Sequence, residues 1–176
     1  MNIELVRLTN EYKEQLFEML EEWKKDIIAN HTDMSPWKIW ANDFHDFDYY
    51  IHNLDTKEES PNGWVPDTTL FCLDKDRNIF VGAVNIRHYL NDALLKTGGH
   101  IGDGIRPSER RKGYATQMLE QALKYCKEEL NLEKVMLGCY KENEASRRTI
   151  LNAGGALERE VKTENGKIAQ VYWIKL

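Results

Sequence analysis

The sequence contains little cysteine, little proline and no long run of apolar residues. Its three cysteines, Cys72, Cys126 and Cys139, are odd in number and lack metal-ligand spacing, so we expect reduced thiols and no metal site. Its apolar runs are too short to cross a membrane, which predicts a chain without a transmembrane helix. The start, Met1–Leu5, lacks the basic and then apolar layout of a secretory signal. These absences together predict a cytoplasmic protein.

What remains is an ordinary globular composition. Apolar residues make up 41% and charged residues 30% of the 176 positions, which is typical of a soluble domain. A chain of this length without repeats, low-complexity segments or linkers predicts one domain over residues 1–176. The formal net charge of −5 argues against general nucleic-acid binding, which needs a basic surface. A homodimer is possible.

Charge is unevenly distributed along the chain. Residues 31–67 carry eight acidic side chains and two lysines, a local net charge of −6, whereas residues 104–116 have a local net charge of +3. Such a pattern suits an anionic cofactor at one site and a cationic amine near the other. The alternative is that the acidic stretch is simply a solvated face.

Hydrophobic periodicity predicts the elements of the first half. Residues 3–8 alternate as a strand, and a helix that Thr9 or Asn10 caps follows with apolar positions up to Ile27. Ser35-Pro36 predicts the start of a second helix. Its apolar face is an aromatic stripe at helical spacing, interpreted as core packing rather than a ligand-stacking surface: Trp37, Trp40, Phe44, Phe47, Ile51 and Leu54.

The second half reads as strands with two intervening helices. Strands are expected at 70–73, 79–87, 101–105 and 134–140, and a hairpin joins strands 156–163 and 167–175 across Asn165-Gly166. An amphipathic helix follows Ala115, and a short helix begins at Asn143 and ends at Gly154. Residues 88–97 have no assignment. The order β-α-α-β-β-β-α-β-α-β-β predicts an α/β fold with one mixed sheet of six or seven strands. The strands at 101–105 and 134–140 should be parallel neighbours in a right-handed crossover.

The junction before the amphipathic helix is unusual. Helix N-termini carry unpaired N–H groups and a partial positive charge, yet this junction holds Arg110, Arg111, Lys112 and Gly113,. Cations beside a positive dipole end are unfavourable unless an anion, most simply a phosphate, completes the site. The alternative is a solvated basic turn with Ser108 as an ordinary cap.

These residues resemble a known family. Arg110-Arg111-Lys112-Gly113-Tyr114-Ala115 is similar to the Arg/Gln-x-x-Gly-x-Gly/Ala signature of the GNAT superfamily of acyl-CoA-dependent N-acetyltransferases,. A second block, Asn143-Glu144-Ala145-Ser146 followed by Gly154, resembles the later Asn-x-x-Ala/Ser…Gly motif of the same fold. The resemblance is firm over residues 101–155 and rests on element order elsewhere.

The resemblance implies acetyl-CoA as the cofactor. The N–H groups from Arg111 to Thr116 would bind its pyrophosphate, with added charge from the side chains of Arg110, Arg111 and Lys112. The pantetheine arm would pair with Gly104-Ile105-Arg106 like an extra strand, and the Ile105 N–H would be the oxyanion donor. Asn143 would contact the arm near its amides, or would be an ordinary helix cap. The implied cofactor-binding residues are Gly104, Ile105, Arg106, Arg110, Arg111, Lys112, Gly113, Tyr114, Ala115, Thr116 and Asn143.

The implied reaction is direct attack of an amine on the thioester, which needs a base. His100 is the first candidate, Asp103 the second and His88 the third. Many relatives carry a tyrosine seven residues after the motif asparagine as the acid, but here that position is Ile150. Tyr140 is the proposed substitute, with water or the substrate ammonium as alternatives.

The sequence is therefore compatible with three functions. The first is an N-acetyltransferase acting on a primary amine of a small molecule or peptide, with Trp37 and Trp40 near the acceptor pocket. The second is an acyl-CoA-binding module with little or no turnover, suggested by Ile150. The third is nucleotide or phosphosugar binding at the same helix start.

Overall fold

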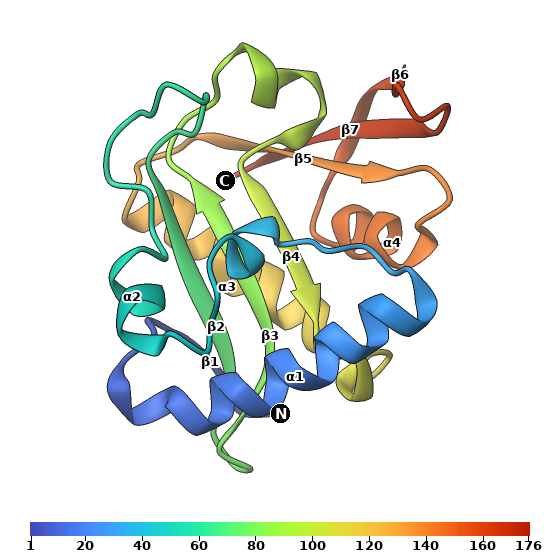
Figure 1. Ribbon diagram of the computed structural model, residues 1–176. Coiled ribbons are helices and arrows are strands. Elements are labelled where there is room, and N and C mark those ends of the chain that lie inside the picture. Colours follow the sequence, from blue (N-terminus) through green and yellow to red (C-terminus); the bar gives the residue numbers. More distant parts are fainter.

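The chain forms seven strands in two antiparallel sheets, and its helices pack around them (Figure 1). The computed structural model describes residues 1–176. Short 3-10 or π turns occupy residues 10–12, 37–40, 94–98 and 107–109. In chain order the main elements are β1 (Ile3–Val6), α1 (Lys13–Asn30), α2 (Phe47–His52), β2 (Asp67–Asp74), β3 (Ile79–Arg87), β4 (Ile101–Ile105), α3 (Tyr114–Glu128), β5 (Lys134–Tyr140), α4 (Glu144–Asn152), β6 (Ala156–Lys162) and β7 (Ile168–Lys175).

The α/β class is confirmed, but the sheet is divided. One sheet has the order β1-β2-β3-β4 and the other β5-β7-β6, and every ladder is antiparallel. The predicted parallel pairing of β4 with β5 does not form. The chain just before β4 contacts β5 through an isolated bridge between Gly99 and Leu137 and through a hydrogen bond from the His100 N–H to the Met136 carbonyl at 2.8 Å. Beyond these contacts β4 and β5 diverge (Figure 1). Gly99 has a φ of 68°, a left-handed conformation that glycine adopts readily and that lets the chain turn from this contact into β4.

The helices cover opposite faces of the larger sheet, α1 on one side and α3 on the other (Figure 1). The buried residues of α1, among them Leu16, Leu20 and Trp23, pack against Phe71 and Phe80 of the sheet. On the opposite face, the apolar stripe of α3 joins Val84, Ile101 and Leu137 in a second cluster. Because both faces of β3 and β4 are anchored, the free edge of β4 is held at a fixed place.

The predicted helix over the aromatic stripe is interrupted. Residues 37–40 form one 3-10 turn, and α2 begins only at Phe47. Between them the Asp43 carboxylate accepts a hydrogen bond from the His45 N–H at 3.0 Å, a local turn that competes with a continuous helix,. Phe44 and Phe47 are buried as expected, but Trp37 is 61% exposed.

The other element predictions were close. The bounds of β3, β4 and β5 match those expected, and Asn143 and Gly154 flank α4. The strand β2 is longer than expected because buried polar residues, Asp67, Thr68 and Thr69, extend it. The unassigned stretch 88–97 contains the start of the π turn at Leu94.

All three cysteines are free thiols, and burial raises the pKa of Cys72 and Cys126 to about 12,. None of the helices combines the length and the apolar character that crossing a membrane requires. No group of three or more His, Cys, Asp or Glu side chains is arranged to hold a metal ion.

Candidate active site

A cleft of about 760 Å³ opens where β4 and β5 diverge. Its walls come from β4, the start of α3, the end of β5 and the first turns of α4. It contains most of the residues that the sequence assigned to a site: Asp103, Gly104, Ile105, Arg110, Arg111, Gly113, Tyr114, Ala115, Thr116, Tyr140 and Asn143. His100, Arg106 and Lys112 do not line it. Residues up to forty positions apart in the sequence therefore meet in one cavity.

The helix start in this cleft has its backbone donors free. None of the N–H groups of residues 111–116 donates a hydrogen bond to another group of the protein. Gly113 is the N-cap residue of α3 with a φ of 89°, and its capping position offers no side-chain acceptor. Arg111 also has a positive φ, 62°. Successive free N–H groups at a helix N-terminus form an anion-binding concavity.

The cations of this junction differ in how they are compensated. Arg110 pairs with Asp26 at 3.0 Å, and Lys112 pairs with Glu109 at 3.1 Å. Arg111 forms no ion pair and lines the cleft. Arg106 lies outside the cleft because its guanidinium pairs with Glu22 of α1 at 2.6 Å. The repulsion expected among the cations is thus largely offset by acidic partners, and Arg111 alone keeps an uncompensated charge beside the free N–H groups.

A buried polar network fixes the first turn of α3 from behind. The Tyr114 hydroxyl donates to Asp74 Oδ2 at 2.6 Å and accepts from Arg77 Nη2 at 2.7 Å. Arg77 also binds Glu109, at 2.7 Å. Burial alone would raise the pKa of Asp74, but the hydrogen bonds from Tyr114 and Arg77 lower it to about 2,. The network holds the glycine loop against β2 without using any N–H group that faces the cleft.

Tyr114→Phe is expected to lower the free energy of unfolding by about 1.5–3 kcal/mol, because it removes one charge-assisted hydrogen bond from the buried Asp74 carboxylate,. Asp74 has a lowered pKa in the folded state, so its contribution is present above its unfolded pKa and is lost as the pH falls toward 2,. Urea unfolding at pH 7 and pH 3 should show a smaller difference between the two proteins at pH 3. Tyr125→Phe, which removes a 3.3 Å bond to the Thr68 hydroxyl, is the control and should cost less. Equal losses for the two variants would contradict this assignment.

The free edge of β4 presents backbone donors to the cleft. The Arg106 N–H donates to the Val81 carbonyl at 2.8 Å, and β3 pairs Gly82 with Ile105 in the same antiparallel register. Because N–H groups alternate in direction along a strand, the Ile105 N–H points away from β3, toward the gap that β5 leaves.

The two glycines of β4, Gly102 and Gly104, allow close approach of neighbouring groups of the protein. A Cβ on Gly104 would overlap the Ser35 carbonyl and the Trp23 ring, and one on Gly102 would lie 3.4 Å from Arg87 Nη2. The β3–β4 register has no shift, so there is no bulge here. These glycines bring the segment after α1 close to β4.

Asn143 lies at the opposite wall of the cleft. Its side-chain oxygen accepts from the Ser146 N–H at 3.2 Å and so caps α4. The same residue lines the cleft, and its amide nitrogen is not used by the cap. The two sequence interpretations of Asn143 are therefore compatible.

A family model described as an acetyltransferase (GNAT) domain matches residues 2–156, which is most of the chain. The chain belongs to the GNAT acetyltransferase family. The expected family, the enzyme class of an acyl-CoA-dependent N-acetyltransferase and acetyl-CoA as its cosubstrate are thereby confirmed. No curated protein matches the chain significantly.

Solved structures with this fold have low sequence identity to the chain. One is the microcin C7 self-immunity acetyltransferase MccE in complex with acetyl-CoA and AMP, with a TM-score of 0.70, 21% identity and coverage of 99% of this chain and 92% of that one. Another is a putative ribosomal-protein-serine acetyltransferase from Vibrio cholerae, with a TM-score of 0.65, 15% identity and coverage of 100% and 95%. A variant of the spermidine N-acetyltransferase SpeG from Vibrio cholerae has a TM-score of 0.64 and 19% identity, and the match covers 98% of this chain and 93% of that one.

In this GNAT chain, His100 is poorly placed for proton transfer in the cleft. The imidazole is 5% exposed, and its Nδ1 accepts a hydrogen bond from the Met136 N–H at 2.9 Å. Burial, together with the charge of Arg87, lowers the pKa of His100 to about 4. The neutral ring ties β4 to β5 just before the two strands separate. His88, the third candidate, is hydrogen-bonded to the Thr68 hydroxyl at 2.8 Å and does not line the cleft.

Asp103, unlike His100, is placed to exchange a proton in the cleft. It lies in the middle of β4 and lines the cleft that opens between β4 and β5. Burial and the nearby charge of Asp33 raise its pKa to about 6,. A carboxylate with a pKa near the working pH of the cell is suited to accept a proton.

The acid position is filled differently from that of many relatives. Ile150 is 3% exposed and lines the cleft, and its side chain has no acidic proton to donate. Tyr140 lines the same cleft at the end of β5. Its ring lies 5.1 Å from Lys167 Nζ, and its hydroxyl accepts a 3.4 Å hydrogen bond from Asn165.

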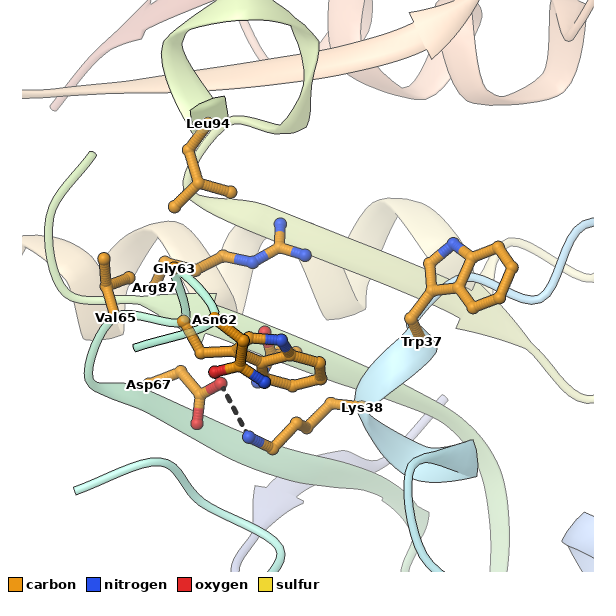
Figure 2. Close-up of a pocket in the computed structure, with 10 residues that line it drawn as sticks. Trp37, Lys38, Asn62, Gly63, Val65, Asp67, Arg87 and Leu94 are labelled. Atoms are coloured by element: carbon orange, nitrogen blue, oxygen red, sulfur yellow. Dashed lines mark ion pairs between the residues drawn. The ribbon is translucent and has the colours of Figure 1, made fainter. Parts of the chain in front are cut away.

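Sequence patterns missed the second part of the site. A cavity of about 260 Å³ lies beside the cleft. Trp37 and Arg87 line this cavity (Figure 2) and also line the cleft. Nothing in the sequence singles out Asp33 among the acidic residues of the 31–67 stretch, although its charge helps to raise the pKa of Asp103. Trp40, which was expected near the acceptor, packs edge-on against Trp23 at 6.0 Å instead. No local motif identifies Arg87, the last residue of β3, as a residue that lines both spaces.

Proposed function

We propose that residues 1–176 form one N-acetyltransferase domain, which binds acetyl-CoA in the cleft and transfers the acetyl group directly to a primary amine. The row of unpaired N–H groups at residues 111–116 carries this proposal. They face a cleft large enough for an extended ligand and have the uncompensated charge of Arg111 beside them. A diphosphate would supply the acceptors that these donors lack.

The cofactor arm would run from α3 along the edge of β4. The pyrophosphate binds the N–H groups from Arg111 to Thr116, with Arg110 at the edge of the site. The arm then pairs with the backbone of residues 104–106 and passes Asn143. The Ile105 N–H, which is directed into the gap between β4 and β5, is the donor to the thioester oxygen. The side chains of Arg106 and Lys112 support the loop through their acidic partners.

The proposed reaction needs no covalent enzyme intermediate. The neutral amine attacks the thioester carbonyl carbon, a C–N bond forms, and collapse of the tetrahedral intermediate breaks the C–S bond. Asp103 takes up the proton that the amine loses, because its raised pKa and its place in the cleft suit a base,. The departing thiolate takes a proton from Tyr140 or from water.

The acceptor would enter from the side of the second cavity. That cavity adjoins the cleft at Trp37 and Arg87, and its volume of about 260 Å³ favours a small molecule over a peptide. Among solved structures of this fold, SpeG is named for spermidine as its acceptor, whereas MccE is named for microcin C7 self-immunity. A cytoplasmic location and a homodimer stay predictions.

The test is steady-state release of free thiol from acetyl-CoA across a panel of primary amines. Turnover with one or more amines, together with cofactor binding, is the expected result. Cofactor binding without turnover by any amine would favour the alternative of an acyl-CoA-binding module, which the loss of the acid at Ile150 motivates. Stabilisation by ATP but not by CoA would instead indicate a nucleotide site.

A further inference from the structure

Arg87 stands at the boundary between the cleft and the second cavity. It is the last residue of β3, and it lines both spaces. In Figure 2 its guanidinium extends into the cavity between Leu94 and the ion pair of Lys38 with Asp67. A ligand that reaches from the cleft into the cavity must therefore pass this group.

The guanidinium has few partners of its own. Its only side-chain hydrogen bonds run from Nη1 to the carbonyls of Gly98 and Gly99, each at 3.3 Å. Nε and Nη2 find no acceptor in the protein, and no carboxylate forms an ion pair with Arg87. Burial lowers its pKa and the charge of Asp67 raises it, but an arginine stays charged at neutral pH. A partly buried, unpaired cation is unfavourable without an anion.

The other cation of the cavity is fully compensated. Lys38 is 8% exposed and pairs with the buried Asp67 at 3.3 Å. It also donates to the Thr56 hydroxyl and lies 4.2 Å from the centre of the Trp64 ring. The acidic Asp67 is thus neutralised within the protein and is not available to a cationic ligand. Arg87 remains as the free charge of this cavity.

The position of Arg87 also relates it to the proposed chemistry. A Cβ on Gly102 would lie 3.4 Å from Nη2 and 3.5 Å from Nη1, so the guanidinium lies against β4 one residue before Asp103. The acidic groups of the cleft, Asp103 and Asp33, would attract the amine end of an acceptor. An anion at Arg87 would then hold the other end of the same small molecule.

We propose that Arg87 determines acceptor specificity by binding the carboxylate or phosphate of an amine substrate, so that the acceptor class is a primary amine that carries an anionic group. This inference rests on the proposed function of the cleft. It predicts rejection of polyamines, because a second ammonium group would meet the guanidinium and find Asp67 already paired. The guanidinium fork suits either anion, since both accept two parallel hydrogen bonds.

The experiment compares four matched amines with the CoA-saturated protein by isothermal titration calorimetry. They are 4-aminobutanoate, 3-aminopropyl phosphate, butylamine and 1,4-diaminobutane. We expect one or both anionic amines to bind at least about 10-fold more tightly than the other two, and the carboxylate and phosphate arms show which anion the site takes. Equal binding, preference for 1,4-diaminobutane or no binding of either anionic amine would overturn the proposal. This comparison needs no variant.

Variants then assign the preference to Arg87. Arg87→Gln should weaken binding of the preferred anion by about 10- to 100-fold, and Arg87→Lys should restore part of it because the charge returns. Arg148→Gln, on the exposed face of α4, is the matched control and should keep the preference. An unchanged preference in Arg87→Gln would refute the assignment. The CoA affinity of the wild-type protein, titrated separately, reports on the proposed function and not on Arg87.

Discussion

Replacing Gly113 with valine is expected to weaken CoA binding by about 100-fold or more, because the branched side chain would occupy the concavity that the N–H groups of residues 111–116 form. Loss of two charge-assisted hydrogen bonds to a phosphate already accounts for a change of this size. The substituted side chain has room in the free protein, since the nearest atom to a Cβ there is Met1 Cε at 3.6 Å. Calorimetric titration with CoA measures the effect.

The control for this substitution is Gly154→Val. Gly154 has a φ of 91°, against 89° for Gly113, and no atom lies within 4 Å of its Cβ position. Both variants therefore carry the same backbone strain, about 1–2 kcal/mol, but only Gly113 lines the cleft. Wild-type affinity in Gly113→Val, or an equal loss in both variants, would show that the cofactor does not bind at this helix start.

Asp103→Asn is expected to lower kcat by about 100- to 10,000-fold, the range that a general base contributes, while CoA affinity stays near that of the wild type. The amide cannot take the proton from the attacking amine, and the substitution keeps the size of the side chain. Kinetics with the best amine of the panel, together with CoA titration, separate the two effects. A comparable loss of CoA affinity would mean that Asp103 supports binding and not proton transfer.

The pH dependence distinguishes Asp103 from His100. The pKa of Asp103 is raised to about 6, so the carboxylate is ionised and active above that pH and is progressively protonated below it. The rate should fall below pH 6 in the wild type. Because the pKa of His100 is lowered to about 4, a base at His100 would keep the rate high down to pH 4. If the pH–rate profile instead falls near pH 4, and this fall disappears in His100→Ala, His100 and not Asp103 would be the base.

Local sequence patterns correctly predicted the elements whose bounds depend on residues close together in the sequence. The bounds of β3 and β5, the hairpin at Asn165-Gly166 and the cap at Asn143 follow from alternation, turn chemistry and a side chain that bonds its own helix start,. The glycine loop at residues 110–113 could be recognised for the same reason, since its motif is contiguous. The aromatic stripe wrongly predicted one continuous helix, because hydrophobic spacing carries no information about the turn that Asp43 forms with the His45 N–H.

The parts that failed depend on tertiary packing. Whether β4 and β5 pair or separate is decided by the turn at Gly99 and by the contacts of α1 and α3, none of which periodicity reports. The same separation buries His100 while it leaves Asp103 in the cleft, although the two residues are three positions apart. The sequence does not single out Arg87, because only the folded structure shows that its guanidinium contacts two carbonyl groups and no carboxylate.

The central claim is that the N–H groups of residues 111–116 bind the diphosphate of CoA, and an NMR titration of the 15N-labelled protein tests it most directly. Addition of CoA is predicted to cause the largest amide shifts at Arg111, Gly113 and Thr116, with a further shift at the Ile105 N–H on the free edge of β4. Binding of CoA that leaves those amides unmoved and shifts a different surface would contradict the account.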